Sequence, residues 1–401
     1  MRSSRRRLAA VRSAVCAVDE LAHQTVVEPD EESLAQRRAA AIAAGAVAVV
    51  ELDAERREAF ARGCPPLEAG ERCPADFVRA AQHLVEHTLA APELALVRWF
   101  LGVADRPPSF TARMPCCLLF RGLGGQAACT TPNIPPELPA GSRSGRSGKI
   151  AAKADAISEA WMMGVKQIRA SAGQEEGDGP GRDDGEGERL PQNLVPVEGR
   201  EEVLGNEGSG KFLGWHCVSL SRLHPLALSI HGADCRQDGG FDRDGLQEER
   251  LGNYLMLYGL RGVRGAPTLC CDSIMALDAL SPEDGHLLRT SGFTFNLTQT
   301  GEGKGSEKGG EGGGKPVVRD HPVTGLPQVR TVEFVPEASP EALGAYERLQ
   351  EAMAERVGFG VELGLDGNDM LLLNNRSAVH GRVGFAARYD GQDRWLQRHG
   401  C

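Results

Sequence analysis

The chain has 401 residues, of which 45 are basic and 55 acidic, and its formal net charge is −10. This acidic balance excludes a general affinity for nucleic acid, and the sequence has no apolar run of about 18 residues that would form an ordinary membrane span. The eleven cysteines include the doublets Cys116–Cys117 and Cys270–Cys271 but no C-x-x-C spacing. We therefore expect reduced thiols in an intracellular protein and no disulfide scaffold.

The first segment, residues 1–29, is rich in arginine and serine and has no acidic residue before Asp19. This composition fits either a basic N-terminal tail or an organelle transit segment. We accordingly expect a cytoplasmic protein, or an organellar one if the segment is a transit peptide.

Three stretches are too rich in glycine, serine or charge to form a packed core. We expect them to be low-complexity insertions within a globular pattern, and they comprise residues 133–148, 171–189 and 301–315.

The remaining sequence predicts helices followed mainly by strands. Residues 30–100 have a helical apolar period and form most of a predicted helical N-terminal layer, residues 30–108. Further helices are predicted at 153–173 and 339–360, the latter with Ser339 as N-cap. Strands are predicted at 116–123, 253–262, 329–336, 369–375 and 393–398. Strands joined by long irregular connections favour an antiparallel β core for residues 109–401.

Two short motifs suggest other functions on weak grounds. The segment HLVEH (83–87) has the spacing of an inverted zinc-peptidase motif, although histidine and glutamate are common on the solvated side of a helix. The segment GNEGSGK (205–211) has P-loop spacing, but Phe212 follows where a metal-binding serine or threonine is required. We interpret the second as a coincidence and keep zinc-dependent peptide cleavage at HLVEH as a third alternative, behind an oxygenase and an inactive binding protein.

The carboxy-terminal stretch contains the most specific pattern. His380 follows an apolar strand, Arg394 comes fourteen residues later, and Arg398 comes four residues after Arg394. On a paired antiparallel strand an arginine can lie near the histidine and bind a carboxylate in bidentate fashion. Arg398 is expected on the same face of its strand as Arg394. The pattern predicts a site for a guest with two carboxylates or a dianion.

The run NNRSAVHGR…FAARYDGQDRWLQR resembles the closing motif of the clavaminate synthase-like branch of the TauD/TfdA superfamily of iron(II)- and 2-oxoglutarate-dependent dioxygenases. The resemblance implies that His380 is the distal iron ligand, that Arg394 binds 2-oxoglutarate and that Arg398 helps to hold an amino-acid substrate. It extends back over residues 110–398, with His216 as the first iron ligand and Thr268 able to hydrogen-bond 2-oxoglutarate.

The resemblance also implies a fold and an activity. The fold would be mainly β with flanking helices, a double-stranded β-helix of the jelly-roll, cupin-like type. The activity would couple oxidative decarboxylation of 2-oxoglutarate to hydroxylation of an amino acid or related small molecule, with Fe(2+), 2-oxoglutarate and O2 required. We expect no nucleic-acid or membrane partner.

The sequence departs from the family pattern at the first iron ligands. The family has His-x-Glu or His-x-Asp, whereas Val218 stands two residues after His216, so the triad of two histidines and one carboxylate is incomplete. Residues 218–247 do not resemble the family and form an atypical insertion. They can be read as a translated intron, since their removal joins Cys217 to Glu248 and restores His-x-Glu.

Two alternatives stay open for this region. The insertion can be a genuine loop that brings Glu248, Asp234 or Asp238 to the metal, or the chain can be a catalytically inactive jelly-roll protein that binds a carboxylate. A second departure is Asn206, which stands where family members often have a serine that contacts substrate.

Overall fold

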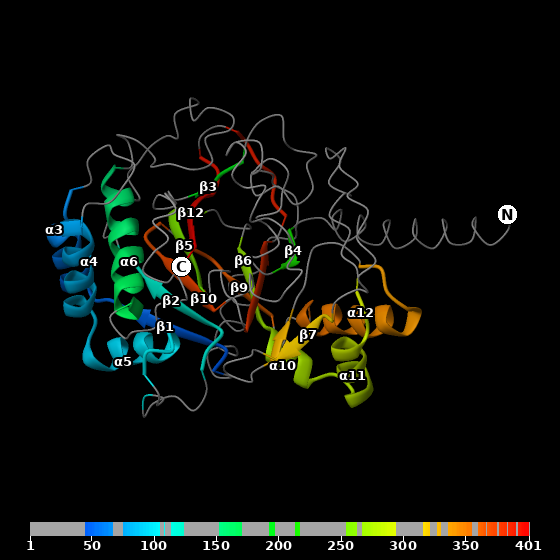
Figure 1. Cartoon of the computed structure of the whole chain (residues 1–401). Coiled ribbons are helices and arrows are strands. Elements are labelled where there is room, and N and C mark those ends of the chain that lie inside the picture. The colour runs from blue at the N-terminus through cyan, green and yellow to red at the C-terminus, as the bar shows by residue number, and fades with distance from the viewer. Residues whose placement is uncertain are drawn as a thin grey trace, which may run out of the picture.

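In the computed structural model of the chain, two β-sheets lie at the centre and helices cover the outer face of each (Figure 1). The structure describes residues 45–66, 75–104, 108, 114–123, 152–170, 192–196, 213–216, 254–262, 267–293, 316–320, 327–329, 336–354, 360–365, 367–374, 377–382, 384–389 and 392–400.

The larger sheet has six strands and is antiparallel except for one edge pair. Its spatial order is β1 (Val47–Glu51), β2 (Cys117–Arg121), β10 (Met370–Asn374), β5 (Tyr254–Arg261), β12 (Trp395–Gly400) and β3 (Gln192–Leu194). Only the pair of β1 and β2 is parallel among these strands. Strands β2, β5 and β10 are nearly continuous apolar runs because both of their faces are covered.

The smaller sheet has four antiparallel strands and carries the candidate site. Its order is β4 (Leu213–His216), β11 (Ala378–Arg382), β6 (Thr268–Asp272) and β9 (Gly360–Leu363). A separate hairpin is formed by β7 (Val318–Asp320) and β8 (Pro327–Val329).

The two large sheets pack face to face through a common apolar core. Leu119 and Leu371 of the larger sheet share one cluster of buried side chains with Cys270 and Ala378 of the smaller sheet. We call the faces that meet in this core the inner faces. Since successive strand residues point to opposite sides, the neighbouring Leu118 points toward the outer helices.

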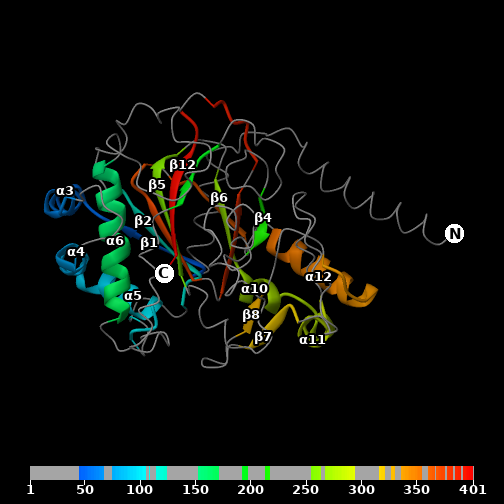
Figure 2. The same cartoon turned by 45° about the horizontal axis from the view of Figure 1, so that its top comes forward.

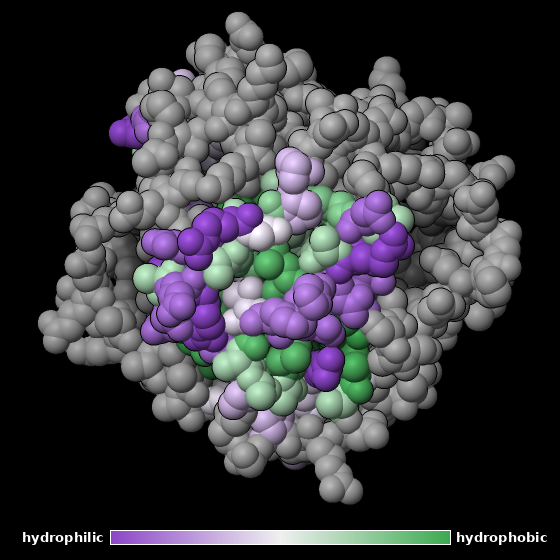
Figure 3. All heavy atoms as spheres, turned by 90° about the vertical axis from the view of Figure 1, so that its left-hand side faces the viewer, coloured by the Kyte–Doolittle hydropathy of each residue, from purple (hydrophilic) through white to green (hydrophobic). Residues whose placement is uncertain are grey.

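One helical layer covers the outer face of the larger sheet (Figures 1 and 2). It comprises α3 (Ala54–Gly63), α4 (Ala75–Thr88), α5 (Ala91–Phe100) and α6 (Ala152–Ala170). Trp161 of α6 stacks on Phe60 with the ring centroids 4.6 Å apart and also packs against Phe120 of β2. The solvent side of this layer is largely hydrophilic, with hydrophobic side chains between the polar ones (Figure 3).

A second helical layer covers the outer face of the smaller sheet. Its helices are α10 (Ser273–Asp278), α11 (Pro282–Thr290) and α12 (Pro340–Ala354). Asp272 ends β6 and begins α10, because its carboxylate accepts hydrogen bonds from the amides of Ile274 and Met275. Cys271 and Val379 point from the sheet into this layer.

The sequence predictions for individual elements are largely confirmed where the structure describes them. Four of the five predicted strands correspond to β2, β5, β10 and β12, and two predicted helices correspond to α6 and α12. Ser339 caps α12, since its hydroxyl accepts a hydrogen bond from the amide of Ala342. Of the fifth predicted strand, 329–336, only Val329 at the end of β8 and Pro336 lie within the described residues.

One expectation is wrong. Residues 47–51 were predicted to be helical with the rest of 30–100, but they form β1 and pair with β2 at the edge of the larger sheet. The valines at 47, 49 and 50 favour this strand because β-branched side chains fit a pleated sheet. The edge of β2 provides backbone groups with which β1 pairs.

Other predictions lie outside the described residues. These concern residues 1–29, 133–148, 171–189, 218–247 and 301–315. Within the part of the chain that the structure describes, no helix is both long and apolar enough to cross a membrane.

Candidate active site between the two sheets

His380 lies in the middle of β11 on the inner face of the smaller sheet. Its neighbours in the strand fix this orientation, because Ala378 belongs to the inner core and Val379 to the core beneath α10–α12. Its Cα is paired with that of His216 on one side and with that of Cys270 on the other. The structure therefore brings together the positions of the two histidines that the sequence singled out.

Arg394 and Thr268 meet at one end of the same inner face. The Arg394 guanidinium donates a hydrogen bond from Nη2 to the Thr268 hydroxyl at 2.6 Å, and both residues are buried. Burial, followed by the like charge of Arg382, lowers the pKa of Arg394 to about 9. Loss of water and a nearby positive charge both disfavour the protonated guanidinium, so a bound anion would stabilise it.

Arg382 is a candidate site residue that the sequence analysis missed. It follows His380 by two positions in β11, shares the inner face, and has Thr268 as its partner in β6. It is only 4 % exposed, and its guanidinium carbon lies 5.2 Å from the centroid of the Phe385 ring. The signal was available, since a spacing of two from a strand histidine places an arginine on the same side.

The loop before Arg394 is held by a buried carboxylate. Asp393 accepts hydrogen bonds from the backbone amides of Arg388 and Tyr389, the latter at 2.7 Å. Tyr389 has a φ of 56°, in the left-handed region, which a non-glycine residue adopts only when its surroundings hold it there. On the other side of Arg394, the Trp395 indole donates a hydrogen bond to the Asn193 side chain at 2.9 Å.

Arg398 lies in β12 and is half-buried. Its partner in the neighbouring strand β5 is Leu257, whose side chain belongs to the inner core. Because paired residues of antiparallel strands project to the same side of the sheet, Arg398 lies on the inner face together with Leu396. Residues 394, 396 and 398 are spaced by two, so Arg394 is also expected on the inner face.

The other predicted site residues fall outside the described part of the chain. They are Asn206, Val218, Asp234, Asp238 and Glu248. For His216 the structure describes only the strand position.

The two histidines of the HLVEH segment lie on the solvent side of α4, and its glutamate is engaged elsewhere. His83 and His87 are exposed on α4, with the His87 ring nitrogen Nδ1 bonded to the carbonyl of His83. Glu86 forms an ion pair with Arg98 of α5 at 3.2 Å. Among the described residues, the one group whose ligand atoms gather closely enough to hold a metal is made of cysteines elsewhere.

The described residues supply two of the three ligand positions in a non-haem iron site of two histidines and one carboxylate. The backbone positions of His216 and His380 lie directly opposite each other on antiparallel strands. Thr268, Arg382 and Arg394 lie farther along the same face and can bind a carboxylate. The carboxylate ligand is the missing element, since its candidates lie outside the described residues.

A comparison with protein families gives a match to the part of the chain that contains most of these residues. Residues 230–399 match the family model described as "Taurine catabolism dioxygenase TauD, TfdA family". The matched span includes Thr268, His380, Arg394 and Arg398, and it begins after His216.

Curated proteins with sequences similar to this chain are amino-acid oxygenases. The L-asparagine oxygenase of Streptomyces coelicolor is 30% identical over 221 residues, which are 52% of this chain and 53% of that protein. The L-ornithine/L-arginine 3-hydroxylase of Catenulispora acidiphila is 26% identical over 230 residues, or 52% of this chain and 59% of that protein. The chain thus spans a little over half the length of these relatives.

Solved structures share the fold over most of the chain. An asparagine oxygenase in complex with Fe(II), 3-hydroxyasparagine and succinate has a TM-score of 0.55 at 22% identity, covering 87% of this chain and 92% of that one. The non-heme iron oxygenase OrfP in complex with Fe and alpha-ketoglutaric acid has a TM-score of 0.54 at 19% identity, with the same coverage. These structures support the mainly β fold with flanking helices.

Proposed function

We propose that the protein is an iron(II)- and 2-oxoglutarate-dependent oxygenase that hydroxylates an amino acid or a closely related small molecule. The observation that carries the proposal is the buried contact between Arg394 and Thr268 on the same inner face as His380. It brings a cation that can bind a carboxylate close to an imidazole that can bind a metal, within the residues that match the TauD/TfdA family model. We further propose that the two sheets form the double-stranded β-helix, or jelly roll, of this family.

In this proposal His216 and His380 hold the iron, with a carboxylate as third ligand for which Glu248 is the first candidate. The bound iron supplies the chemistry that couples decarboxylation of 2-oxoglutarate to oxidation of a C–H bond. The protein supplies position and a dry site. Arg394 binds the distal carboxylate of 2-oxoglutarate, and the Thr268 hydroxyl orients the guanidinium through its hydrogen bond.

Arg382 has an electrostatic part in the same site. Two guanidinium groups buried near each other repel, as the lowered pKa of Arg394 indicates, and a carboxylate placed between or beside them removes this repulsion. Arg382 therefore makes the empty pocket less favourable and the anion-bound pocket more favourable.

The substrate class follows from the relatives and from one residue. The relatives act on asparagine, ornithine, arginine and enduracididine, and Arg398 on the inner face offers a second carboxylate-binding cation. We propose that Arg398 binds the α-carboxylate of a free amino acid, with Asn206 as a further contact. The substrate is a small molecule and no macromolecular partner is required.

The experiment is a coupled assay with the purified chain, Fe(II), 2-oxoglutarate, oxygen and a panel containing asparagine, ornithine and arginine. We expect succinate and a product one oxygen atom heavier than one of the amino acids, and no succinate from His380→Ala. Arg394→Lys keeps the charge but loses bidentate geometry, so its KM for 2-oxoglutarate should rise about tenfold or more.

A second candidate function is the inactive carboxylate-binding protein, which Val218 at the position of the usual metal-binding carboxylate favours. It predicts that 2-oxoglutarate binds through Arg394 while no succinate is released under any of these conditions. That result would overturn the oxygenase proposal.

A further inference from the structure

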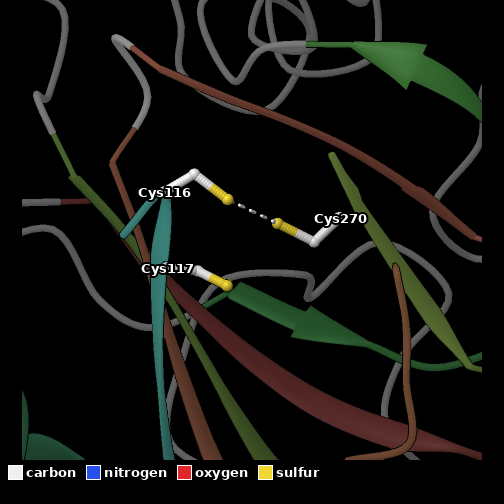
Figure 4. Close-up of side chains that lie close together, drawn as sticks. All are labelled: Cys116, Cys117 and Cys270. Carbon is white, nitrogen blue, oxygen red and sulfur yellow. Dashed lines mark hydrogen bonds between the residues drawn. The ribbon is translucent and has the colours of Figure 1, made fainter. Parts of the chain in front are cut away.

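Three buried cysteines form a cluster that joins the two sheets near, but outside, the candidate iron site. Cys116 precedes β2, Cys117 begins it, and Cys270 lies in the middle of β6 on the opposite sheet. Their sulfur atoms all lie within 4.8 Å of one another, and those of Cys116 and Cys270 are 3.7 Å apart (Figure 4). Each of the three side chains is at most 1 % exposed.

The backbone around the cluster is fixed on both sides. The Cys116 amide donates to the carbonyl of Ala46 at 2.9 Å, and its own carbonyl accepts from the amide of Asn374 at 3.0 Å. Cys270 is paired with His380 on one side and with Val361 on the other. Three sulfur atoms are thus held together by strands of both sheets, with little freedom to separate.

We propose that Cys116, Cys117 and Cys270 form a second metal site, which binds a divalent thiophilic cation such as Zn²⁺ through three thiolates. A tetrahedral ion with metal–sulfur bonds of about 2.3 Å places its sulfur ligands about 3.8 Å apart. The separation of 3.7 Å between Cys116 and Cys270 matches this spacing. Its ligands differ from those proposed for the iron, with Cys270 the cross-strand neighbour of His380, and the proposal does not rest on the oxygenase activity.

The net charge of the site indicates whether a divalent or a monovalent soft cation binds there. Three thiolates around a divalent ion leave a net charge of −1, whereas a monovalent copper ion would leave −2 in a core lined by leucines. The Asp272 carboxylate, which acts on Cys116 and Cys117, adds further negative potential. Because buried unbalanced charge is costly, the divalent ion is favoured.

The thiols are protonated while no metal is bound. Contact with the Cys116 side chain, together with burial, holds the pKa of the Cys117 thiol well above its ordinary value. The metal must displace these protons, so binding releases them to solvent. In its metal-free form the cluster is inert as a nucleophile, since the thiolate is the reactive species.

Cys271 provides a matched control. It is the next residue of β6, equally buried, but it points to the opposite side of the sheet, into the core beneath α10–α12. Replacement of Cys271 therefore removes a buried thiol from the same strand without touching the cluster.

The experiment uses the full chain in which the other seven cysteines, at positions 16, 64, 73, 129, 217, 235 and 401, are replaced by serine. The protein is produced in zinc-supplemented medium, so that entry of metal into a folded core does not limit occupancy. Zinc per chain is measured by elemental analysis, and exchange with cadmium is followed by thiolate-to-cadmium charge-transfer absorbance. We expect one zinc per chain and a cadmium–thiolate band.

Each variant has a defined outcome. Cys116→Ala and Cys270→Ala should lose the band and one zinc per chain, whereas Cys271→Ala should keep both. His380→Ala should keep the band, and any zinc that it loses belongs to the proposed iron site. Circular dichroism checks that each variant is folded, and Cys117→Ala replaces any that is not. A folded parent chain without zinc or band, or a band that survives Cys270→Ala, would overturn the proposal.

Discussion

Arg394 has an environment unlike that of an ordinary surface arginine. It is buried, it lies near a second buried arginine, and its pKa is lowered to about 9. In the unfolded chain an arginine stays protonated up to about pH 12.5. The buried charge therefore lowers the free energy of unfolding at every pH below about 9, and this cost diminishes as the pH rises above that value. A buried charge that reduces stability in this way is typical of a binding site for an anion.

This environment predicts a pH dependence of carboxylate binding. With a pKa of about 9 in the free protein, Arg394 is almost fully protonated at pH 7.5 and about one quarter protonated at pH 9.5, so 2-oxoglutarate should bind the metal-free protein about fourfold more weakly at the higher pH. Isothermal titration calorimetry at the two pH values measures this ratio. Arg394→Gln should bind weakly at both, and a wild-type affinity that does not change would contradict the assignment.

The residue scale also shows what the sequence could reveal. The spacing of His380 and Arg394 suggested an arginine on a strand paired with that of the histidine, and this is wrong, because β11 and β12 belong to different sheets. Arg394 instead approaches the smaller sheet from the opposite one and contacts Thr268. The spacing of Arg382 from His380 could have placed it on the same face, but its pairing with Thr268 depends on the register of β11 and β6. The register of two paired strands is set by the packing of both strands, so it cannot be predicted from the sequence of one segment.

At the scale of elements, the turn before β12 controls the position of Arg394. Asp393→Ala removes the acceptor for the amides of Arg388 and Tyr389 and leaves the left-handed Tyr389 backbone unsupported. We expect a loss of about 1–3 kcal/mol in the free energy of unfolding and a several-fold higher KM for 2-oxoglutarate.

Asp393→Asn is the control for this turn. Its amide oxygen can still accept a hydrogen bond, so most of the affinity for 2-oxoglutarate should return. Equal effects of both variants on stability, with no change in KM, would show that the turn has no part in positioning Arg394.

The packing of α6 against α4 gives a prediction about stability alone. A Cβ at Gly164 would lie 2.6 Å from a methyl group of Val85 and 2.8 Å from the carbonyl oxygen of Ala81. The α4 backbone would have to shift to make room for this Cβ, so Gly164→Ala should destabilise the protein by about 1–3 kcal/mol. Thermal or urea unfolding measures the change.

Gly344→Ala is the matched helix control. The nearest atom to its Cβ is the end of the flexible Arg348 side chain at 3.4 Å, so alanine should be neutral or stabilising by up to about 1 kcal/mol. If both alanine variants behave alike, close packing between α4 and α6 is not the cause.

Elements differ in how well the sequence predicts them. The long apolar strands β5 and β10 and the amphipathic helices were recognisable from their periodicity. The strands β3, β4 and β9 have three or four residues each, which is too short for a periodic signal. β1 was read as helix because it follows an alanine-rich stretch, and only its pairing with β2 makes it a strand.

At the scale of the whole molecule, the two helical layers explain why the inner faces can carry function. They bury the outer faces of both sheets and so form two apolar cores of their own. Because these cores contribute much of the stability, the inner faces can accommodate the polar residues His380, Arg382 and Arg394. The sequence indicated a β core with helices, but not that one sheet would be covered by N-terminal helices and the other by α10–α12.

The segment 218–247 gives a prediction for the molecule as a whole. If Glu248 is the third iron ligand of the His-x-Glu pattern, a chain lacking residues 218–247 should bind Fe(II) about tenfold or more tightly than the chain with them. Glu248→Gln in the shortened chain should abolish the gain. A shortened chain that folds and binds iron no better would contradict this role for Glu248.

The most direct test of the account is the affinity for 2-oxoglutarate measured anaerobically with and without Fe(II), in the wild-type chain and in His380→Ala. The account predicts that Fe(II) tightens binding of 2-oxoglutarate to the wild type by about tenfold or more, because chelation adds to the contact with Arg394, and that His380→Ala loses this enhancement. Equal affinity with and without iron in the wild type would contradict it, and would identify a protein that binds the carboxylate without the metal.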